Sequence, residues 1–353
     1  MDADLSESLR QAVLNAADSG TPLRIAGSGS KAFYGGKSSG VLLETAGHAG
    51  ILRFEPTELV LTARCGTPLS DIEAVLAEYG QMLPFEPPYF GAGATLGGTL
   101  ACGFSGPRRP FAGSARDCML GCRILNDNGE ILSFGGEVMK NVAGFDVSRL
   151  MVGAMGTLGV ILEASLKVSP KPERELTVCF EQSIQAALST MNRWCSEPWP
   201  LSGLACDGRR IYARLSGSER AIEAVYRKFG GDASPDGDAF WRDLREQRHE
   251  FFCSGGNLWR ISLAPATPVL DLPGVWFYDW GGALRWLKTD APSETVFRAA
   301  QSAGGHAALF RGQGGDGPVF QPLPSGLKSL HANLKRAFDP KGLFNPGRLY
   351  EDL

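Results

Sequence analysis

The chain has 353 residues, of which 43% are hydrophobic and 21% are charged, and its net charge is −3. This composition is typical of a globular protein, and the length is sufficient for two domains with substantial cores. A near-neutral charge without a long Lys/Arg block argues against a nucleic-acid partner.

The sequence shows neither a targeting segment nor a metal-binding pattern. The start, "MDADLSESLR", is acidic and lacks the apolar stretch of a secretory signal. The run "LMVGAMGTLGVIL" (residues 150–162) is too short and too glycine-rich to span a bilayer. None of the eight cysteines forms Cys-x-x-Cys, and the nearest pair, Cys118 and Cys122, has no second pair beside it. We therefore expect reduced thiols, no metal site, no transmembrane segment and a cytoplasmic location.

The first elements are a helix, a strand, a glycine- and serine-rich loop and a second strand. Leu5, Leu9, Val13 and Ala16 form the apolar stripe of the helix, which ends before the sequence "GTP". The strand "LRIA" leads into the loop "GSGSKAFYGGKSSG", and the strand "VLLET" follows. The clearly amphipathic helix therefore precedes the loop in the sequence.

This loop contains two phosphate-binding patterns. Residues 27–32 fit the dinucleotide fingerprint, and Gly36-Lys37-Ser38 resembles the end of a nucleotide-triphosphate loop. The second pattern requires glycine where Lys31 stands, and the first requires a helix directly after it, where only glycines and serines follow. The loop can still bind phosphate through consecutive backbone N–H groups, with the hydroxyls of Ser28 and Ser30 as further donors. The simpler interpretation is an ordinary turn.

A strand over residues 58–65 and a second helix follow. Thr67 is a suitable N-cap, with Pro68 at the first helical position. The stretch 91–106 is rich in Gly, Ala, Ser and Thr, and such small residues let the backbone approach a large flat ligand closely. The apolar face of the second helix consists of Leu69, Ile72, Leu76 and Tyr79.

The third glycine-rich block, residues 135–172, predicts a short helix over 146–151, a turn and the strand "VILEASLKVSP". Beyond it, a β-α-β-β-α order suggests a ferredoxin-like domain. The last helix presents Leu327, Leu330 and Leu334 on one face. Five of the seven tryptophans fall between residues 241 and 286, which fits a domain core or a cleft facing a ligand.

Together, "GSGSKAFYG", "ATLGGTLACGFSGPRRPFAGSARD" and "KNVAGFDVSRLMVGAMGTLGVILEASLKVSPKP" resemble the FAD domain of the vanillyl-alcohol oxidase / p-cresol methylhydroxylase (VAO/PCMH) superfamily. Within it, the whole chain resembles the family of FAD-binding subunits E of bacterial glycolate oxidases. The resemblance implies an α+β fold, with a two-subdomain PCMH-type FAD-binding domain over residues 1–172. The rest of the fold would be an α+β, ferredoxin-like cap over residues 173–337 and a C-terminal segment over 338–353. This last segment would return to the FAD domain.

The same resemblance implies which residues bind the cofactor. The loop lacks the histidine that attaches flavin covalently in some relatives, so the FAD would be noncovalent. The ending "FDPKGLFNPGRLY" resembles the family's C-terminal return to the flavin. The implied cofactor-binding residues are Gly27, Ser28, Gly29, Ser30, Lys31, Thr95, Leu96, Gly97, Gly98, Gly103, Ser105, Gly106, Gly113, Ser114, Gly156, Gly159, Val160 and Asn345.

Catalytic residues are not identified by the sequence. Oxidation of a 2-hydroxy acid needs a cation for the carboxylate and a base for the hydroxyl proton. The family's larger subunits carry a paired-histidine motif, of which this chain keeps only a Gly-Asp-Gly core at residues 315–317. The candidates are His306, Arg260 and Arg285.

Three functions stay open. The chain could be an FAD-bearing subunit of a glycolate oxidase complex, with a larger FAD-binding subunit and an iron–sulfur subunit as partners. This complex could associate peripherally with the inner membrane. Alternatively, it could be a self-sufficient dehydrogenase of glycolate, D-lactate or a similar acid, or a structural subunit with a vestigial flavin site.

Overall fold

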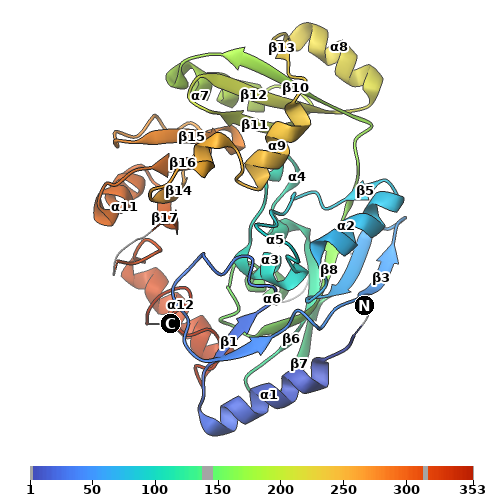
Figure 1. Cartoon of the computed structure of the whole chain (residues 1–353), viewed down its shortest axis with the longest axis vertical. Helices are drawn as coiled ribbons and strands as arrows, with labels where there is room; N and C mark the ends of the chain where they lie inside the picture. The colour runs from blue at the N-terminus through green and yellow to red at the C-terminus, as the bar shows by residue number, and fades with distance from the viewer. Residues whose placement is uncertain (1–2, 137–145, 313–316, 353) are drawn as a thin grey trace. The chain divides into compact units, whose positions relative to one another are not determined.

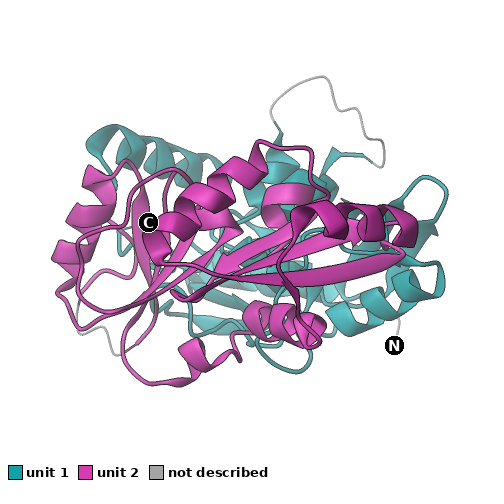
Figure 2. Ribbon diagram, turned by 90° about the horizontal axis from the view of Figure 1, so that it is seen from above, with its two compact units in different colours: residues 1–105, 113–170, 322–353 teal, residues 106–112, 171–321 magenta. Residues whose placement is uncertain are grey.

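The structure is a computed structural model, and it describes residues 3–136, 146–312 and 317–352 (Figure 1). The chain forms two compact units (Figure 2). Unit 1 contains Met1–Ser105, Gly113–Pro170 and Pro322–Leu353, and unit 2 contains Gly106–Ala112 and Lys171–Gln321. Part of the third glycine-rich block and most of the Gly-Asp-Gly core lie outside the described residues.

Unit 1 is built on a five-stranded antiparallel sheet with the order β3-β4-β8-β6-β7. The central strand β8 buries all of its residues except the last, as expected for a strand covered on both faces. The strands are β3 (Ile51–Glu55), β4 (Val60–Arg64), β6 (Met119–Leu125), β7 (Ile131–Gly135) and β8 (Val160–Lys167).

Two small sheets and six helices complete the part of unit 1 that the structure describes. The strands β1 (Leu23–Ala26) and β2 (Val41–Glu44) pair in parallel, and the glycine- and serine-rich loop connects them. The strands β5 (Gln81–Met82) and β9 (Ser169–Pro170) form an antiparallel pair. The helices are α1 (Ser6–Ser19), α2 (Leu69–Glu78), α3 (Leu96–Cys102), α5 (Ala115–Cys118), α6 (Val147–Met151) and α12 (Ser325–Phe338).

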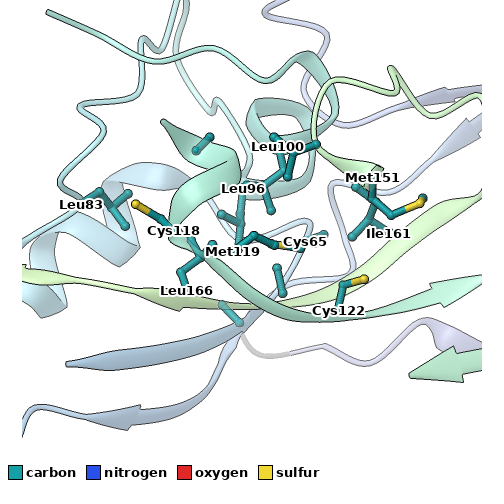
Figure 3. Close-up of a cluster of buried hydrophobic side chains, with 14 of the residues drawn as sticks. Cys65, Leu83, Leu96, Leu100, Cys118, Met119, Cys122, Met151, Ile161 and Leu166 are labelled. Atoms are coloured by element: carbon teal, nitrogen blue, oxygen red, sulfur yellow. The ribbon is translucent and has the colours of Figure 1, made fainter. Parts of the chain in front are cut away.

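The larger core of unit 1 lies between the five-stranded sheet and the helices α2 and α3. Figure 3 shows Leu96 and Leu100 of α3 beside Cys65 and Met119 in this cluster. The apolar face predicted for α2 is buried at Leu69, Ile72 and Leu76.

Two details of the α2 prediction are wrong. The N-cap is Pro68, whose side chain has no hydrogen-bonding group, and the Thr67 hydroxyl bonds to the backbone of Gly50 and does not cap the helix. Tyr79 is 57% exposed, since it follows the end of the helix and leaves the buried face.

A second core of unit 1 joins α1 to β1 and to the C-terminal segment, and it includes Leu9, Val13 and Phe344. Helix α12 differs from the sequence expectation. Its predicted apolar face is largely exposed, with Leu327 at 49% and Leu330 at 52%. The helix has no fully buried residue, and amphipathic periodicity alone cannot show whether a face has a neighbour.

Unit 2 is built on an eight-stranded antiparallel sheet with the order β13-β10-β12-β11-β15-β16-β14-β17. The predicted β-α-β-β-α order is present as β10, α7, β11, β12 and α8, and the sheet continues well beyond it. The strands are β10 (Arg174–Glu181), β11 (Leu201–Cys206), β12 (Arg210–Gly217), β13 (Asp232–Ala233), β14 (Leu258–Ser262), β15 (Val275–Asp279), β16 (Leu284–Lys288) and β17 (His306–Arg311).

The helices of unit 2 surround an aromatic core. Trp241, Trp259, Trp280 and Trp286 are all buried, so the tryptophan-rich stretch supplies core side chains. The helices are α4 (Arg109–Ala112), α7 (Ile184–Cys195), α8 (Glu219–Phe229), α9 (Gly237–Arg245), α10 (Glu250–Cys253), α11 (Ser293–Ser302) and the 3₁₀ helix η1 (Trp280–Gly282).

Candidate cofactor-binding site

A pocket in unit 1 brings together segments that are far apart in the sequence. It contains about 900 Å³ of empty space, which includes open solvent at its mouth. The loop after β1, the helix α3, the turn before β8 and the C-terminal segment all line it. From the predicted cofactor residues, the lining includes Gly27, Ser28, Gly29, Ser30, Lys31, Thr95, Gly97, Gly98, Gly156, Gly159, Val160 and Asn345.

The loop after β1 has the conformation of an anion-binding turn. Gly29 has a φ of 77°, which glycine adopts without strain. The backbone N–H groups of Gly27, Ser28 and Gly29 have no acceptor in the described part of the chain. A Cβ at Gly27 would lie 2.4 Å from Oγ1 of Thr95, so this glycine lets the loop pack on the start of α3. The loop can therefore direct N–H groups at an anion.

The backbone N–H groups at the start of α3 already have hydrogen-bond acceptors within the protein. The Leu96 N–H donates to Thr67 O (2.9 Å), the Gly97 N–H donates to Cys65 O (2.7 Å), and the Gly98 N–H donates to Oγ1 of Thr95 (3.2 Å). Leu96 is fully buried and lies outside the pocket lining. The small residues of this turn thus let the backbone come close to the pocket.

Asn345 connects three parts of the site. Its Oδ1 accepts a hydrogen bond from the Ile25 N–H (2.7 Å), and its Nδ2 donates to Met155 O (2.7 Å). Its own N–H donates to Leu23 O (2.9 Å). Asn345 is 5% exposed and lines the pocket while it holds β1 against the turn before β8.

Three cations line the pocket, and no carboxylate does among the described lining residues. Lys31 is 6% exposed, and its Nζ donates to Tyr89 O (3.2 Å) and Ser30 Oγ (3.4 Å). Burial lowers the pKa of Arg348, and the charge of Arg24 lowers it further, although a guanidinium keeps its proton at neutral pH. The electrostatic field of this pocket therefore favours an anion.

Cys102 lies in the same pocket as a neutral thiol. Burial raises the pKa of Cys102 to about 11, and the charges of Lys31 and Arg348 only partly oppose this shift. No sequence motif was used to predict Cys102, Arg24 or Arg348 as pocket residues. An arginine directly after "NPG" in the C-terminal motif was the available signal for Arg348.

The other predicted cofactor residues lie outside this pocket lining. The Ser105 hydroxyl accepts a hydrogen bond from the Ala115 N–H (3.0 Å), and Ser114 forms a capping box with Asp117 at the start of α5. Gly103 ends α3 with a φ of 66°. Gly113 also has a positive φ, and Gly106 belongs to unit 2.

The three catalytic candidates lie in unit 2. Arg285 is fully buried, and its guanidinium donates to the carbonyl oxygens of Gly282, Pro268 and Thr267. These contacts favour a structural role for Arg285. The sheet register places His306 opposite Ser262, and Arg260 opposite Ala308, so His306 and Arg260 are diagonal neighbours on one face.

His306 and Arg260 differ from Arg285 in their surroundings. His306 is exposed as a residue, but nearby atoms partly desolvate it. This desolvation lowers its pKa, the charge of Arg260 lowers it further, and the neutral imidazole is favoured. The guanidinium carbon of Arg260 lies 5.3 Å from the centre of the Trp280 ring. A neutral histidine beside a cation is a chemically suitable pair for a base and a carboxylate-binding group.

Comparison with known proteins decides the family. Residues 3–135 match a family model described as an FAD binding domain. The chain is 49% identical over 352 residues to the glycolate oxidase subunit GlcE of Escherichia coli (strain K12), covering 100% of this chain and 99% of that protein. The chain belongs to the GlcE family. It is an oxidoreductase subunit of the FAD-dependent class, as the resemblance of its motifs predicted.

More distant relatives cover less of the sequence or share only the fold. The glycolate oxidase subunit GlcD of Bacillus subtilis (strain 168) is 34% identical over 143 residues, which are 40% of this chain and 30% of that protein. A solved structure of alkyldihydroxyacetonephosphate synthase has a TM-score of 0.64 at 16% identity, covering 97% of this chain and 76% of that one. The α+β fold class is thereby confirmed.

The pocket fits the diphosphate part of FAD. Its three cations match two phosphate charges, the unused N–H groups of the first loop are anion donors, and a side chain at Gly29 would meet no protein atom within 4 Å. We find no group of three or more His, Cys, Asp or Glu side chains arranged for a metal in the described ranges. Nor does any helix in those ranges have the length and apolar character needed to cross a bilayer.

Proposed function

We propose that this chain is the FAD-bearing subunit of a complex that oxidises glycolate to glyoxylate and passes the electrons to an iron–sulfur partner. The observation that carries the proposal is the pocket whose described lining has three cations and no carboxylate, in a chain that is 49% identical to GlcE over its full length. The intact pocket argues against a vestigial flavin site.

The chain's own residues would bind and orient the cofactor. The N–H groups of residues 27–29 and the side chains of Lys31 and Arg348 would hold the diphosphate, and Asn345 would keep β1 and the turn before β8 together around it. When bound, FAD would supply the acceptor for the two electrons that leave glycolate. If glycolate were oxidised on this chain itself, its hydroxyl proton would need a base, for which His306 is the candidate.

The electrons must then leave the chain. Four of the cysteine side chains are buried core residues, and burial raises the pKa of each thiol. They are Cys65, Cys118, Cys122 and Cys206. The cysteine spacing also lacks the tight runs that usually hold iron–sulfur clusters. Both features support an acceptor on another subunit.

A second function is favoured by one observation, the pairing of neutral His306 with Arg260 on one sheet face. Such a pair would let the chain oxidise a small 2-hydroxy acid without a partner. Under our first proposal the substrate is oxidised mainly on the larger flavin subunit, and the two functions therefore differ in what the isolated chain can do.

The test is anaerobic mixing of the purified, flavin-loaded chain with glycolate, while the flavin absorbance near 450 nm is followed. We expect slow or no bleaching by the chain alone and bleaching after a GlcD-type subunit is added. Fast, complete bleaching by the chain alone would instead establish the self-sufficient dehydrogenase. A purified chain that neither carries nor takes up FAD would overturn the proposed function altogether.

A further inference from the structure

The C-terminal segment of unit 1 pairs with β1 at the edge of the pocket. The Leu23 N–H donates to Leu343 O (2.7 Å), and the Asn345 N–H donates to Leu23 O (2.9 Å). Leu23 and Phe344 form a parallel bridge. The segment thus extends the β1–β2 pair on the side opposite β2.

A buried carboxylate forms the turn that leads into this segment. Oδ1 of Asp339 accepts a hydrogen bond from the Leu343 N–H (2.9 Å), and Oδ2 accepts one from the Phe344 N–H (2.8 Å). Asp339 is 2% exposed. A carboxylate this deeply buried needs a nearby positive charge, because desolvation otherwise disfavours its charged form.

Lys335, at the end of α12, supplies this charge. Its Nζ lies 2.6 Å from Oδ2 of Asp339 and donates to Thr157 O and Phe344 O, both at 2.8 Å. These three acceptors match the three donors of an ammonium group. One side chain thereby connects α12, the turn before β8 and the C-terminal segment.

Further along, the C-terminal segment holds the first loop of the pocket. Nη1 of Arg348 donates to Gly36 O (3.0 Å), and Nη2 donates to Lys31 O and Ala32 O, both at 3.3 Å. The Gly36 N–H donates to Arg348 O (2.9 Å). The loop that presents the free N–H groups is therefore fixed by this segment, through an arginine that also lines the pocket.

We propose that Lys335 and Asp339 are positioning residues of the cofactor pocket, which act through Arg348 on the first loop without lining the pocket themselves. This inference rests on the proposed function, since it assumes that the pocket takes FAD. Without Lys335, the buried Asp339 carboxylate has lost its counter-charge, the turn over 339–344 relaxes, and Arg348 no longer fixes the loop.

The first experiment measures FAD binding to the apoprotein by quenching of flavin fluorescence. We expect Lys335→Met to weaken FAD binding by about tenfold or more, the size of effect of losing a charge-assisted hydrogen bond in a site. Arg336→Met is the matched control, because Arg336 is the exposed neighbouring cation of α12 and donates only to Asn333 of the same helix in the described contacts. The control should bind FAD as the wild type does.

A double-variant cycle separates positioning through Arg348 from a general loss of stability. If Lys335 acts through Arg348, Lys335→Met in the Arg348→Met background should weaken FAD binding much less than it does in the wild type. Lys335→Arg keeps the positive charge and should restore part of the affinity. Fully additive effects, or a Lys335→Met variant with wild-type affinity, would overturn the proposal.

Hydrogen exchange of the apoprotein gives a reading that does not depend on flavin. Lys335→Met should speed exchange at the Gly36 and Asn345 amides and leave α2 unchanged. Exchange that changes only within α12 would contradict the proposal, even if the protein failed to bind FAD at all. Should Lys335→Met not fold, Asp339→Asn removes the same charge pair with little change of shape and is judged by the same results.

Discussion

Single residues decide the chemistry of the pocket through backbone freedom and charge. Gly29 provides the positive φ that turns the first loop, and Gly27 provides room beside Thr95. Lys31 and Arg348 place positive charge around the same space. An anion held there is bound by fixed N–H groups and by cations in a partly desolvated site, where electrostatic interactions are stronger than in water.

Gly29→Val should abolish retention of FAD. A β-branched residue at a φ of 77° is strained by roughly 1–2 kcal/mol, and its side chain would occupy the space beside the N–H groups. The measurement is the ratio of flavin to protein after gel filtration. Gly20→Val is the matched control, because Gly20 has a φ of 63° and an equally open environment but lies at the end of α1. Equal flavin ratios in the two variants would contradict the assignment of the loop.

Whole helices of unit 1 differ in what their apolar faces contact. Leu76 of α2 is fully buried against the five-stranded sheet, whereas Leu330 of α12 is 52% exposed. Both helices have amphipathic sequences, so their periodicity gave no reason to treat them differently. The stability contributed by each face depends on its neighbours.

We expect Leu76→Ala to lower the free energy of unfolding by about 2–5 kcal/mol, as is usual for a leucine removed from a packed core. Leu330→Ala should change it by less than about 0.5 kcal/mol, because its surroundings are solvent. Urea denaturation of the isolated chain measures both values. A large loss of stability in Leu330→Ala would mean that α12 has a covered face in solution.

The strands of unit 2 hold the inserted segment 106–112 through a charged cluster. Glu175 of β10 accepts hydrogen bonds from Arg108 and from the Ser216 hydroxyl, and Arg214 lies 3.9 Å away. Burial by itself would raise the pKa of Glu175, but the charges of Arg214 and Arg108 outweigh it and lower the pKa. The ionised carboxylate is therefore favoured by folding.

Glu175→Gln should destabilise the chain by about 1.5–3 kcal/mol at pH 7, the usual value for hydrogen bonds to a charged group. Because the folded-state pKa is the lower one, this stabilisation is present above the ordinary value of 4.5 and is lost as the pH falls below it. Unfolding curves of wild type and variant between pH 7 and pH 3.5 provide the test. If the difference in unfolding free energy between wild type and variant does not shrink on acidification, Glu175 is not stabilised as an ionised carboxylate in this cluster.

At the scale of the whole molecule, the two units contain different candidate sites. Unit 1 contains the pocket proposed for the cofactor within its own residues, and unit 2 contains His306 and Arg260, the candidates proposed for substrate contact. The full-length relationship to GlcE shows that both units belong to one family of chains.

Acid precipitation of the flavin-loaded chain should release FAD into the supernatant. The first loop contains no histidine that could attach the flavin, and the pocket lining offers Cys102 only as a thiol whose raised pKa keeps it neutral. Chromatography of the supernatant identifies the flavin. Yellow colour that stays with the pellet would indicate a covalent bond, and FMN in the supernatant would contradict the choice of cofactor.

The sequence by itself determined the family, the fold class and the glycine-rich elements of the pocket, because glycine positions and strand patterns report local backbone requirements. Gly27, Gly29 and Gly156 could be chosen from motifs, and the positive φ of Gly29 and Gly156 is a local property of the backbone, whereas the room that Gly27 and Gly156 leave for Thr95 and Asn345 became visible only in the fold. Only the tertiary structure brought Arg24 and Arg348 to one pocket, buried Arg285 among carbonyl oxygens and left Leu327 and Leu330 of α12 exposed. Arg24 and Arg348 are 324 positions apart in the sequence, and the surroundings of Arg285 and α12 depend on how neighbouring segments fold around them, so no local pattern encodes these outcomes.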